Sequence, residues 1–164
     1  MVPEGIVLRP ATEADVEPLV ALLQEPAIRA WWGENDADSV RAELHVAWAI
    51  EIGGELAGQL LIHEETEPDY PSVAFDIVLA SRFHGHGHGA DALRLAVRRM
   101  IARGHHRFQI DPTVSNVAAI KSYASVGFRP VGILRASERD PEGGWRDALL
   151  MDLLAGELIE REVE

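Results

Sequence analysis

The chain has 164 residues, 47% of them hydrophobic, with no cysteine and a formal net charge of −12. This length suits one domain with a core of its own, and the hydrophobic content excludes a chain that is disordered throughout. The lack of cysteine excludes disulfides, cysteine metal sites and a cysteine nucleophile, and it fits a reducing cytoplasm. The acidic charge disfavours nucleic acid and anionic lipid as partners; it either attracts polycations or serves only solubility.

Nothing in the sequence predicts membrane insertion or secretion. No apolar run approaches the roughly 20 residues of a membrane-spanning helix. Residues 1–5 contain no basic segment followed by an apolar one, so they do not resemble a signal peptide. We therefore expect a cytoplasmic protein without a membrane partner.

The first part of the chain predicts a strand followed by helices. An apolar strand covers residues 6–9. The next apolar residues recur at the spacing of one helix face, at Val16, Leu19, Val20 and Leu23. Thr12 or Asp15 can cap this helix, and a cap at Asp15 leaves Pro18 in the first turn, where proline costs little. Residues 36–44 predict one or two further helical turns.

Two adjacent tryptophans, Trp31 and Trp32, lie between these helical segments. Neighbouring residues cannot share one helix face, and indole joins an apolar body to a polar N–H group. Either one ring packs while the other borders a cleft, or both are core or interface aromatics.

A β-hairpin and a further strand come next. Residues 45–52 and 55–63 are β-compatible and flank a Gly-Gly turn signal. An acidic loop follows, which is either a solvated surface or a wall that binds cations; its acids are Glu64, Glu65, Glu67 and Asp69. The strand 73–79 carries Asp76 among apolar neighbours, so this carboxylate either faces solvent or lines a site.

Three histidines alternate with three glycines at residues 84–89, between the strand 73–79 and a predicted helix at 90–102. Glycine permits positive φ and close backbone approach, and a helix N-terminus offers unpaired N–H groups. We favour an anion cradle here, most often used for phosphate. The alternatives are a metal site and a flexible turn with solvated histidines, at His84, His86 and His88.

The last part of the chain predicts a strand, a helix and two more strands. The first strand covers residues 106–111. Ser115 or Asn116 can cap the helix, and Gly127 ends it. The final strands cover residues 128–137 and 145–154.

The sequence shows no internal repeat and no domain boundary, so residues 1–154 are expected to form one domain. Residues 155–164 contain four Glu and one Arg. We expect this acidic C-terminal tail to be a separate helix or disordered.

The order of elements and three motifs resemble the GCN5-related N-acetyltransferase (GNAT) superfamily. The family's pyrophosphate loop, Gln/Arg-x-x-Gly-x-Gly/Ala, matches with Gly87 and Gly89 as its glycines and with His84 in place of Gln or Arg. A neutral His donates one hydrogen bond where Arg donates several. The start Leu8-Arg9-Pro10-Ala11-Thr12 with Asp15 is frequent in the family. The more specific signature Asn-x-x-Ala-Ile-x-x-Tyr-x-x-x-Gly-Phe matches at Asn116, Ala119, Ile120, Tyr123, Gly127 and Phe128.

This resemblance covers about residues 6–154 and implies an α/β (α+β) fold of the GNAT type. That fold has a mixed, mostly antiparallel twisted sheet of about seven strands flanked by helices. The implied activity is acetyl transfer from the co-substrate acetyl-CoA to an amine, without a metal. The cofactor-binding residues would be Ile77, Val78, His84, Gly85, His86, Gly87, His88, Gly89, Asn116 and Tyr123.

The resemblance gives catalytic roles to Asp76 and Tyr123. Asp76 would act as the base or orient the ammonium group; a reference pKa of about 3.9 makes it a weak base, so a water relay or a raised pKa is expected. Tyr123 would protonate the leaving thiolate, with core packing as its alternative role. A backbone N–H near Ile77 or Val78 would stabilise the oxyanion.

A closer resemblance is to the aminoglycoside 6′-N-acetyltransferases. It rests on Trp31-Trp32-Gly33, on the acidic run 64–68 leading to Phe75-Asp76-Ile77, and on Asp111-Pro112 with Ser115-Asn116. It implies an acidic cleft for a polycationic sugar, as in antibiotic resistance. The substrate-binding residues would be Trp31, Trp32, Glu64, Glu65, Asp76 and Asp111.

Two other functions stay open. One is a GNAT enzyme for another amine, such as a siderophore hydroxylamine, a polyamine or a protein lysine. The other is a non-catalytic acyl-CoA-binding module, against which the intact Asp76 and Tyr123 argue. We expect no nucleic-acid partner and either a monomer or a homodimer.

Overall fold

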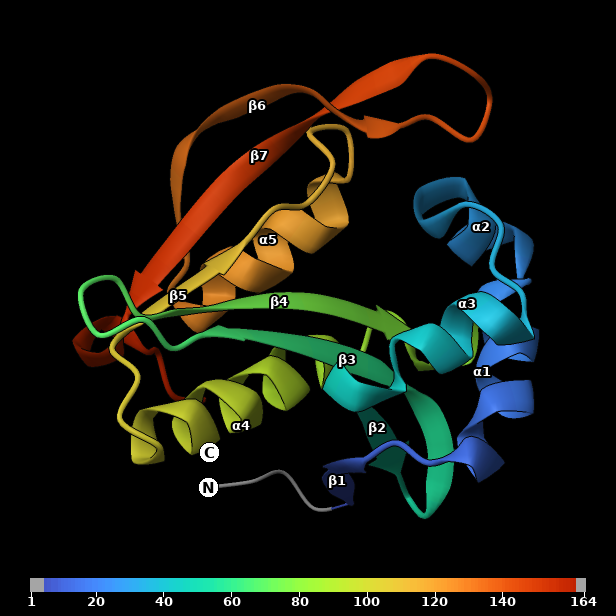
Figure 1. Cartoon of the computed structure of the whole chain (residues 1–164), viewed down its shortest axis with the longest axis horizontal. Helices are drawn as coiled ribbons and strands as arrows, with labels where there is room; N and C mark the ends of the chain where they lie inside the picture. Colours follow the sequence, from blue (N-terminus) through green and yellow to red (C-terminus); the bar gives the residue numbers. More distant parts are fainter. Residues whose placement is uncertain (1–4, 162–164) are drawn as a thin grey trace.

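Figure 1 shows a computed structural model of the chain, which describes residues 5–161. Seven strands make one sheet: β1 (Ile6–Pro10), β2 (Ala47–Ile52), β3 (Glu55–Glu65), β4 (Ser72–Leu79), β5 (Arg107–Ile110), β6 (Arg129–Arg139) and β7 (Trp145–Leu154). The helices are α1 (Val16–Leu23), α2 (Pro26–Trp32), α3 (Ala37–Ala42), α4 (His88–Ala102) and α5 (Val117–Val126). This arrangement confirms the predicted mixed α/β fold.

The sheet has the strand order β1-β2-β3-β4-β5-β7-β6, and all neighbours are antiparallel except β4 and β5. That parallel pair is joined through only two residue pairs, Val73 with Phe108 and Ala74 with Gln109. Beyond Ala74 the two strands part. Parallel ladders need a crossover connection, and here α4 supplies it.

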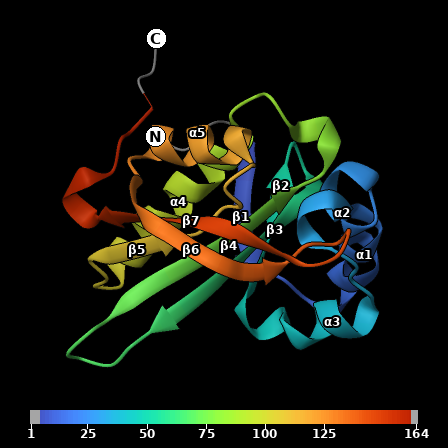
Figure 2. The same cartoon turned by 90° about the horizontal axis from the view of Figure 1, so that it is seen from above.

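The hydrophobic core has two parts. The larger cluster joins the sheet to α4 and α5 and contains the stacked rings of Phe75 and Phe108. The smaller cluster joins α1, α2 and α3 to the end of β4 through Val78. Figure 2 shows these three helices grouped at one end of the molecule. The end of β4 therefore contributes to both clusters, Leu79 to the larger one and Val78 to the smaller one.

The start of α1 combines both predicted capping residues. Thr12 precedes a short 3₁₀ turn, Glu13–Asp15, and α1 follows with Pro18 in its first turn. The Asp15 carboxylate accepts hydrogen bonds from the Thr12 N–H and from both terminal nitrogens of Arg9, each at 2.8 Å. These bonds, those from Arg9 first, lower the pKa of Asp15.

Helix α5 begins and ends as its sequence predicts. The Asn116 side chain caps it by accepting a hydrogen bond from the Ala119 N–H at 3.3 Å. Gly127 ends it with a φ of +117°, and a Cβ there would lie 2.5 Å from the Glu157 carbonyl oxygen. Glycine is therefore required at this position on two grounds.

The described part of the C-terminal tail packs against the domain, which differs from the expected separate helix or disorder. After a 3₁₀ turn, Ala155–Glu157, the Ile159 N–H donates to the Val126 carbonyl oxygen at 2.9 Å. The buried Arg94 donates to the carbonyl oxygens of Ile159 and Ser125, both at 2.8 Å. A buried guanidinium needs such acceptors, and the tail supplies one. Residues 162–164 lie outside the described part of the chain.

Candidate active site

The candidate site opens where β4 and β5 part. The Ala80 N–H donates to the Ala57 carbonyl oxygen on β3, and the β3–β4 register is regular. Because N–H groups alternate sides along a strand, those of Ile77 and Leu79 point into the gap and that of Val78 points to β3. Of the two expected oxyanion donors, Ile77 is therefore suitably directed and Val78 is not.

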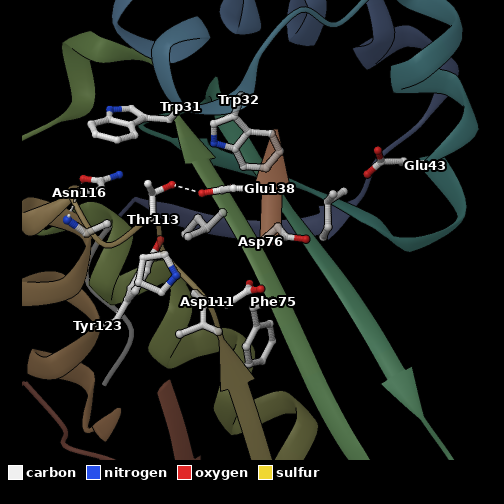
Figure 3. A pocket seen from close by; sticks show the side chains of 15 residues that line it. Trp31, Trp32, Glu43, Phe75, Asp76, Asp111, Thr113, Asn116, Tyr123 and Glu138 are labelled. Atoms are coloured by element: carbon white, nitrogen blue, oxygen red, sulfur yellow. Dashed lines mark hydrogen bonds between the residues drawn. The ribbon is translucent and has the colours of Figure 1, made fainter. Parts of the chain in front are cut away.

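One side of the gap is a cleft lined by four acidic side chains: Glu43, Asp76, Asp111 and Glu138. Figure 3 shows that these come from different parts of the chain and surround the same space, with Trp31 and Trp32 across it. No Lys or Arg side chain lines this cleft among residues 5–161. The cleft therefore presents negative charge to whatever enters it.

The carboxylates in the cleft disfavour one another's charged forms. Partial burial raises the pKa of Asp76, Glu138 raises it further, and His63, with Nε2 3.6 Å from Oδ2, opposes the rise. Partial burial also raises the pKa of Asp111, and the charges of Asp76 and Glu138 add to this. Carboxyl groups with raised pKa values are better proton acceptors near neutral pH than ordinary ones.

Tyr123 lines the acidic cleft and also the pocket beside it. Burial raises the pKa of its phenol far above the usual value, and the charges of Asp76 and Asp111 add to the effect. The hydroxyl therefore keeps its proton at neutral pH and is available as a hydrogen-bond donor.

The second pocket lies between the end of β4, α2 and the glycine loop. Gly85 and Gly87 both have φ of +79°, and a Cβ at either would meet no protein atom within 4 Å. Gly87 is also the N-cap of α4, whose first intrahelical bond runs from the Asp91 N–H to the Gly87 carbonyl oxygen. The N–H groups of the first turn are thus unpaired, as an anion cradle requires.

Residues 11–128 match the acetyltransferase (GNAT) family. The chain belongs to the GNAT family of acetyltransferases. It is therefore an N-acetyltransferase, and enzymes of this family use acetyl-CoA. The unpaired N–H groups and the open space at Gly87 suit the pyrophosphate of that co-substrate.

Solved structures of acetyltransferases have the same fold. RimJ of Mycobacterium smegmatis, in complex with CoA-disulfide, is 26% identical with a TM-score of 0.81, over 94% of this chain and 84% of that one. AAC(6′)-Ib, in complex with parmomycin and acetyl-CoA, is 24% identical with a TM-score of 0.78, over 98% and 100%. RimL, a ribosomal L7/L12 alpha-N-protein acetyltransferase, is 20% identical with a TM-score of 0.80, over 94% and 92%. No curated protein matches the chain in sequence.

The three loop histidines of this GNAT chain have different environments. The Nε2 atom of His84 lies 2.8 Å from the Leu79 carbonyl oxygen, which ties the loop to the end of β4. His88 lines the pocket and packs its ring against Phe83. His86 does not line the pocket; its ring lies 5.7 Å from that of His88. Within residues 5–161, no three His, Asp or Glu side chains gather to hold a metal.

Two expected substrate residues, Glu64 and Glu65, do not reach the acidic cleft, so that part of the prediction is wrong. The Glu64 carboxylate lies 2.8 Å from His105 Nε2 and 3.0 Å from Arg103. Glu65 pairs with Ser72, whereas Asp76 pairs with Leu61, nearer the other end of β3. Because each strand residue advances by about 3.3 Å, both acids lie too far along β3.

The structure adds three polar cleft residues that the sequence analysis did not identify: Glu43, Thr113 and Glu138. Thr113 follows Asp111-Pro112 directly, so its position could have been inferred. Glu138 follows an irregularity of β6, where the register shifts between Leu134 and Glu138 and Ala136 has a φ of +48°. Such a bulge redirects side chains in a way that strand alternation does not predict.

Within residues 5–161 no helix is long and apolar enough to cross a membrane.

Proposed function

We propose that this GNAT enzyme acetylates a primary amine of a small polycation, and that the 6′-amine of an aminoglycoside is its substrate. The observation that carries the proposal is the set of four carboxylates at one cleft without a lining Lys or Arg among residues 5–161. Arg146, which lies outside the lining, pairs with Glu138, so the cleft keeps an excess of negative charge. Each ammonium group of a polycation can pair with a carboxylate, and the indole rings offer a flat surface to a sugar.

The acetyl-CoA pocket adjoins this cleft. The backbone of residues 85–89 would hold the pyrophosphate, and His84 and His88 would border it. Asn116 would contact the pantetheine arm or the turn that follows it. Ile77, Asn116 and Tyr123 line both spaces, so the thioester would meet the amine between them.

Transfer requires a neutral amine, because an ammonium group has no lone pair. Asp76, whose pKa is raised, would take the proton directly or through water. The amine nitrogen then forms a bond to the thioester carbon, and the Ile77 N–H would stabilise the developing oxyanion. When the C–S bond breaks, the Tyr123 hydroxyl would give its proton to the departing thiolate. The amine nitrogen, which must lose a second proton to become an amide, would return a proton to the phenolate directly or through water.

A second candidate substrate is a protein amine. The space beside Asp76 and Asp111 continues along the sheet past Ala74, Gln109 and Leu150. An extended peptide could lie along this strip with its N-terminal amine at the carboxylates. RimL, which has the same fold, is named for that reaction.

The experiment measures CoA thiol release with two aminoglycosides that differ only in a 6′-amine or a 6′-hydroxyl. Because the enzyme has no cysteine, the thiol signal comes from CoA alone. Rapid release with the amine only is expected. Release with neither compound, but with a peptide that has a free N-terminus, would reject the aminoglycoside and favour the second candidate.

A further inference from the structure

Arg146 connects the hairpin formed by β6 and β7 to helix α2. Its side chain is only 13% exposed, although both neighbours in sequence are exposed. One terminal nitrogen donates to the Ala30 carbonyl oxygen at 2.8 Å and the other donates to the Trp31 carbonyl oxygen. The guanidinium carbon also lies 5.5 Å from the centre of the Trp31 ring. The Arg146 side chain therefore contacts both the backbone of residues 30–31 and the indole ring of Trp31.

Helix α2 needs such an attachment. It has seven residues and is capped by Gly33 at its C-terminus, and Ile28 is its one buried residue. The last carbonyl groups of a helix have no intrahelical donor and carry partial negative charge. A guanidinium offers five donors in a fixed plane, so Arg can bind two such carbonyls and still donate elsewhere, whereas Lys cannot reproduce that geometry.

The third contact of Arg146 is with the acidic cleft. Its Nε donates to Glu138 Oε1 at 3.1 Å, and the Thr113 hydroxyl donates to the same oxygen. Among the described residues, no hydrogen-bond donor contacts the other oxygen, Oε2. Glu138 is thus fixed through one oxygen while the second stays available to a substrate cation.

We propose that Arg146 is a positioning residue that sets the selectivity of the amine site. It holds Trp31 in place and orients the Glu138 carboxylate, so that polycations are preferred over amines with a single charge. This inference rests on the proposed function, because it assumes that the cleft binds the amine. Arg146 itself does not line the cleft.

The test compares Arg146→Met and Arg146→Lys with wild type and with the matched control Arg139→Met. Arg139 lies in the same hairpin, but its guanidinium stacks on the exposed Trp145, at 4.5 Å, instead of on α2. For each protein we would measure KM and kcat with the best acceptor of the wild type, the Kd of acetyl-CoA, and the kcat/KM ratio for a diamine and a monoamine of equal carbon skeleton.

We expect Arg146→Met to raise the KM of the acceptor about tenfold or more and to reduce the diamine preference, because the charged hydrogen bonds are lost. Arg146→Lys should recover part of both, and Arg139→Met should behave as wild type. Acetyl-CoA binding should weaken much less than acceptor binding, by about threefold at most, because Trp31 and Trp32 only border its pocket whereas the loop backbone holds the pyrophosphate.

Wild-type KM and diamine preference in a folded Arg146→Met would overturn the inference. So would equal weakening of acetyl-CoA and amine binding in Arg146→Lys, because that pattern indicates only a loosened fold. A wild type that prefers monoamines would instead reject the proposed function, and the KM comparison would still decide whether Arg146 positions the acceptor site.

Discussion

Asp76 shows how the surroundings of one residue suit it to a chemical task. Partial burial and, to a smaller extent, the charge of Glu138 raise the pKa of Asp76, which makes its charged form a stronger proton acceptor. The nearby His63 side chain, also half-exposed, limits that rise. The pKa of Asp76 is therefore raised above that of an ordinary carboxylate, but less than burial alone would raise it.

Replacing Asp76 with Asn should lower kcat by about 10²-fold or more, because the amide cannot accept the proton of the amine. The Kd of acetyl-CoA should stay within about twofold, since the glycine loop lies on a different part of the site. Steady-state kinetics and calorimetric titration would measure the two effects. Unchanged turnover would exclude Asp76 as the group that accepts the proton of the amine.

Asp111 makes a prediction about stability and pH. Its pKa is raised, so between the ordinary value of 3.8 and the raised value the folded state binds more protons than the unfolded state. The contribution of Asp111 to stability therefore falls as the pH rises through this window. Asp111→Asn should raise the Tm of the ligand-free enzyme at pH 7 and lose this advantage below the ordinary pKa.

Thermal melts at several pH values would test this, with Asp69→Asn as the control, because Asp69 lies in an exposed loop. A gain in Tm that is the same at every pH would contradict the electrostatic explanation.

Among the elements, the junction of β4 and α4 shows how backbone geometry prepares a binding site. Gly87 needs its positive φ, whereas a Cβ at Gly89 would meet the Leu79 side chain at an ordinary 3.7 Å. Gly87→Val should therefore weaken acetyl-CoA binding about tenfold or more, and Gly89→Ala should stay within about threefold. Tight acetyl-CoA binding by Gly87→Val, measured by calorimetry, would refute the cradle.

The pairing of β3 with β4 depends on Gly58. A Cβ there would lie 2.0 Å from the Val78 carbonyl oxygen, which belongs to the backbone and cannot swing away. Gly58→Ala should lower the free energy of unfolding by about 2 kcal/mol or more, because the strands must separate. Urea denaturation would measure this, and wild-type stability would show that β3 can shift without cost.

At the scale of the whole molecule, the net charge of −12 and the cleft carboxylates act in the same direction. Charge of one sign focused in a cleft raises the local concentration of oppositely charged substrate, and salt screens this effect. Raising NaCl from about 0.05 M to about 0.5 M should increase the KM of a polycationic amine more than that of a monoamine. Equal changes for both amines would indicate that charge does not guide the substrate.

Much of the molecule could be predicted from sequence because local rules determine it. The cap at Asn116, the stop at Gly127 and the glycine loop each depend on conformations that few residues adopt. The partners of Glu64 could not be predicted, because His105 and Arg103 meet it only after α4 has packed on the sheet. Glu138 and Arg146 meet at the acidic cleft through a β-bulge and a helix end that carry no sequence signal.

Four polar or aromatic side chains line both the acidic cleft and the acetyl-CoA pocket: Trp31, Trp32, Asn116 and Tyr123. A substitution at any of them therefore alters amine binding and acetyl-CoA binding together. Besides Asp76, four polar residues line the acidic cleft but not the acetyl-CoA pocket: Glu43, Asp111, Thr113 and Glu138. Substitutions at these four positions could therefore change which amine is acetylated while the acetyl-CoA pocket stays unaltered. Diversification of substrate range would be concentrated in the end of α3, the turn after β5 and the β6–β7 hairpin.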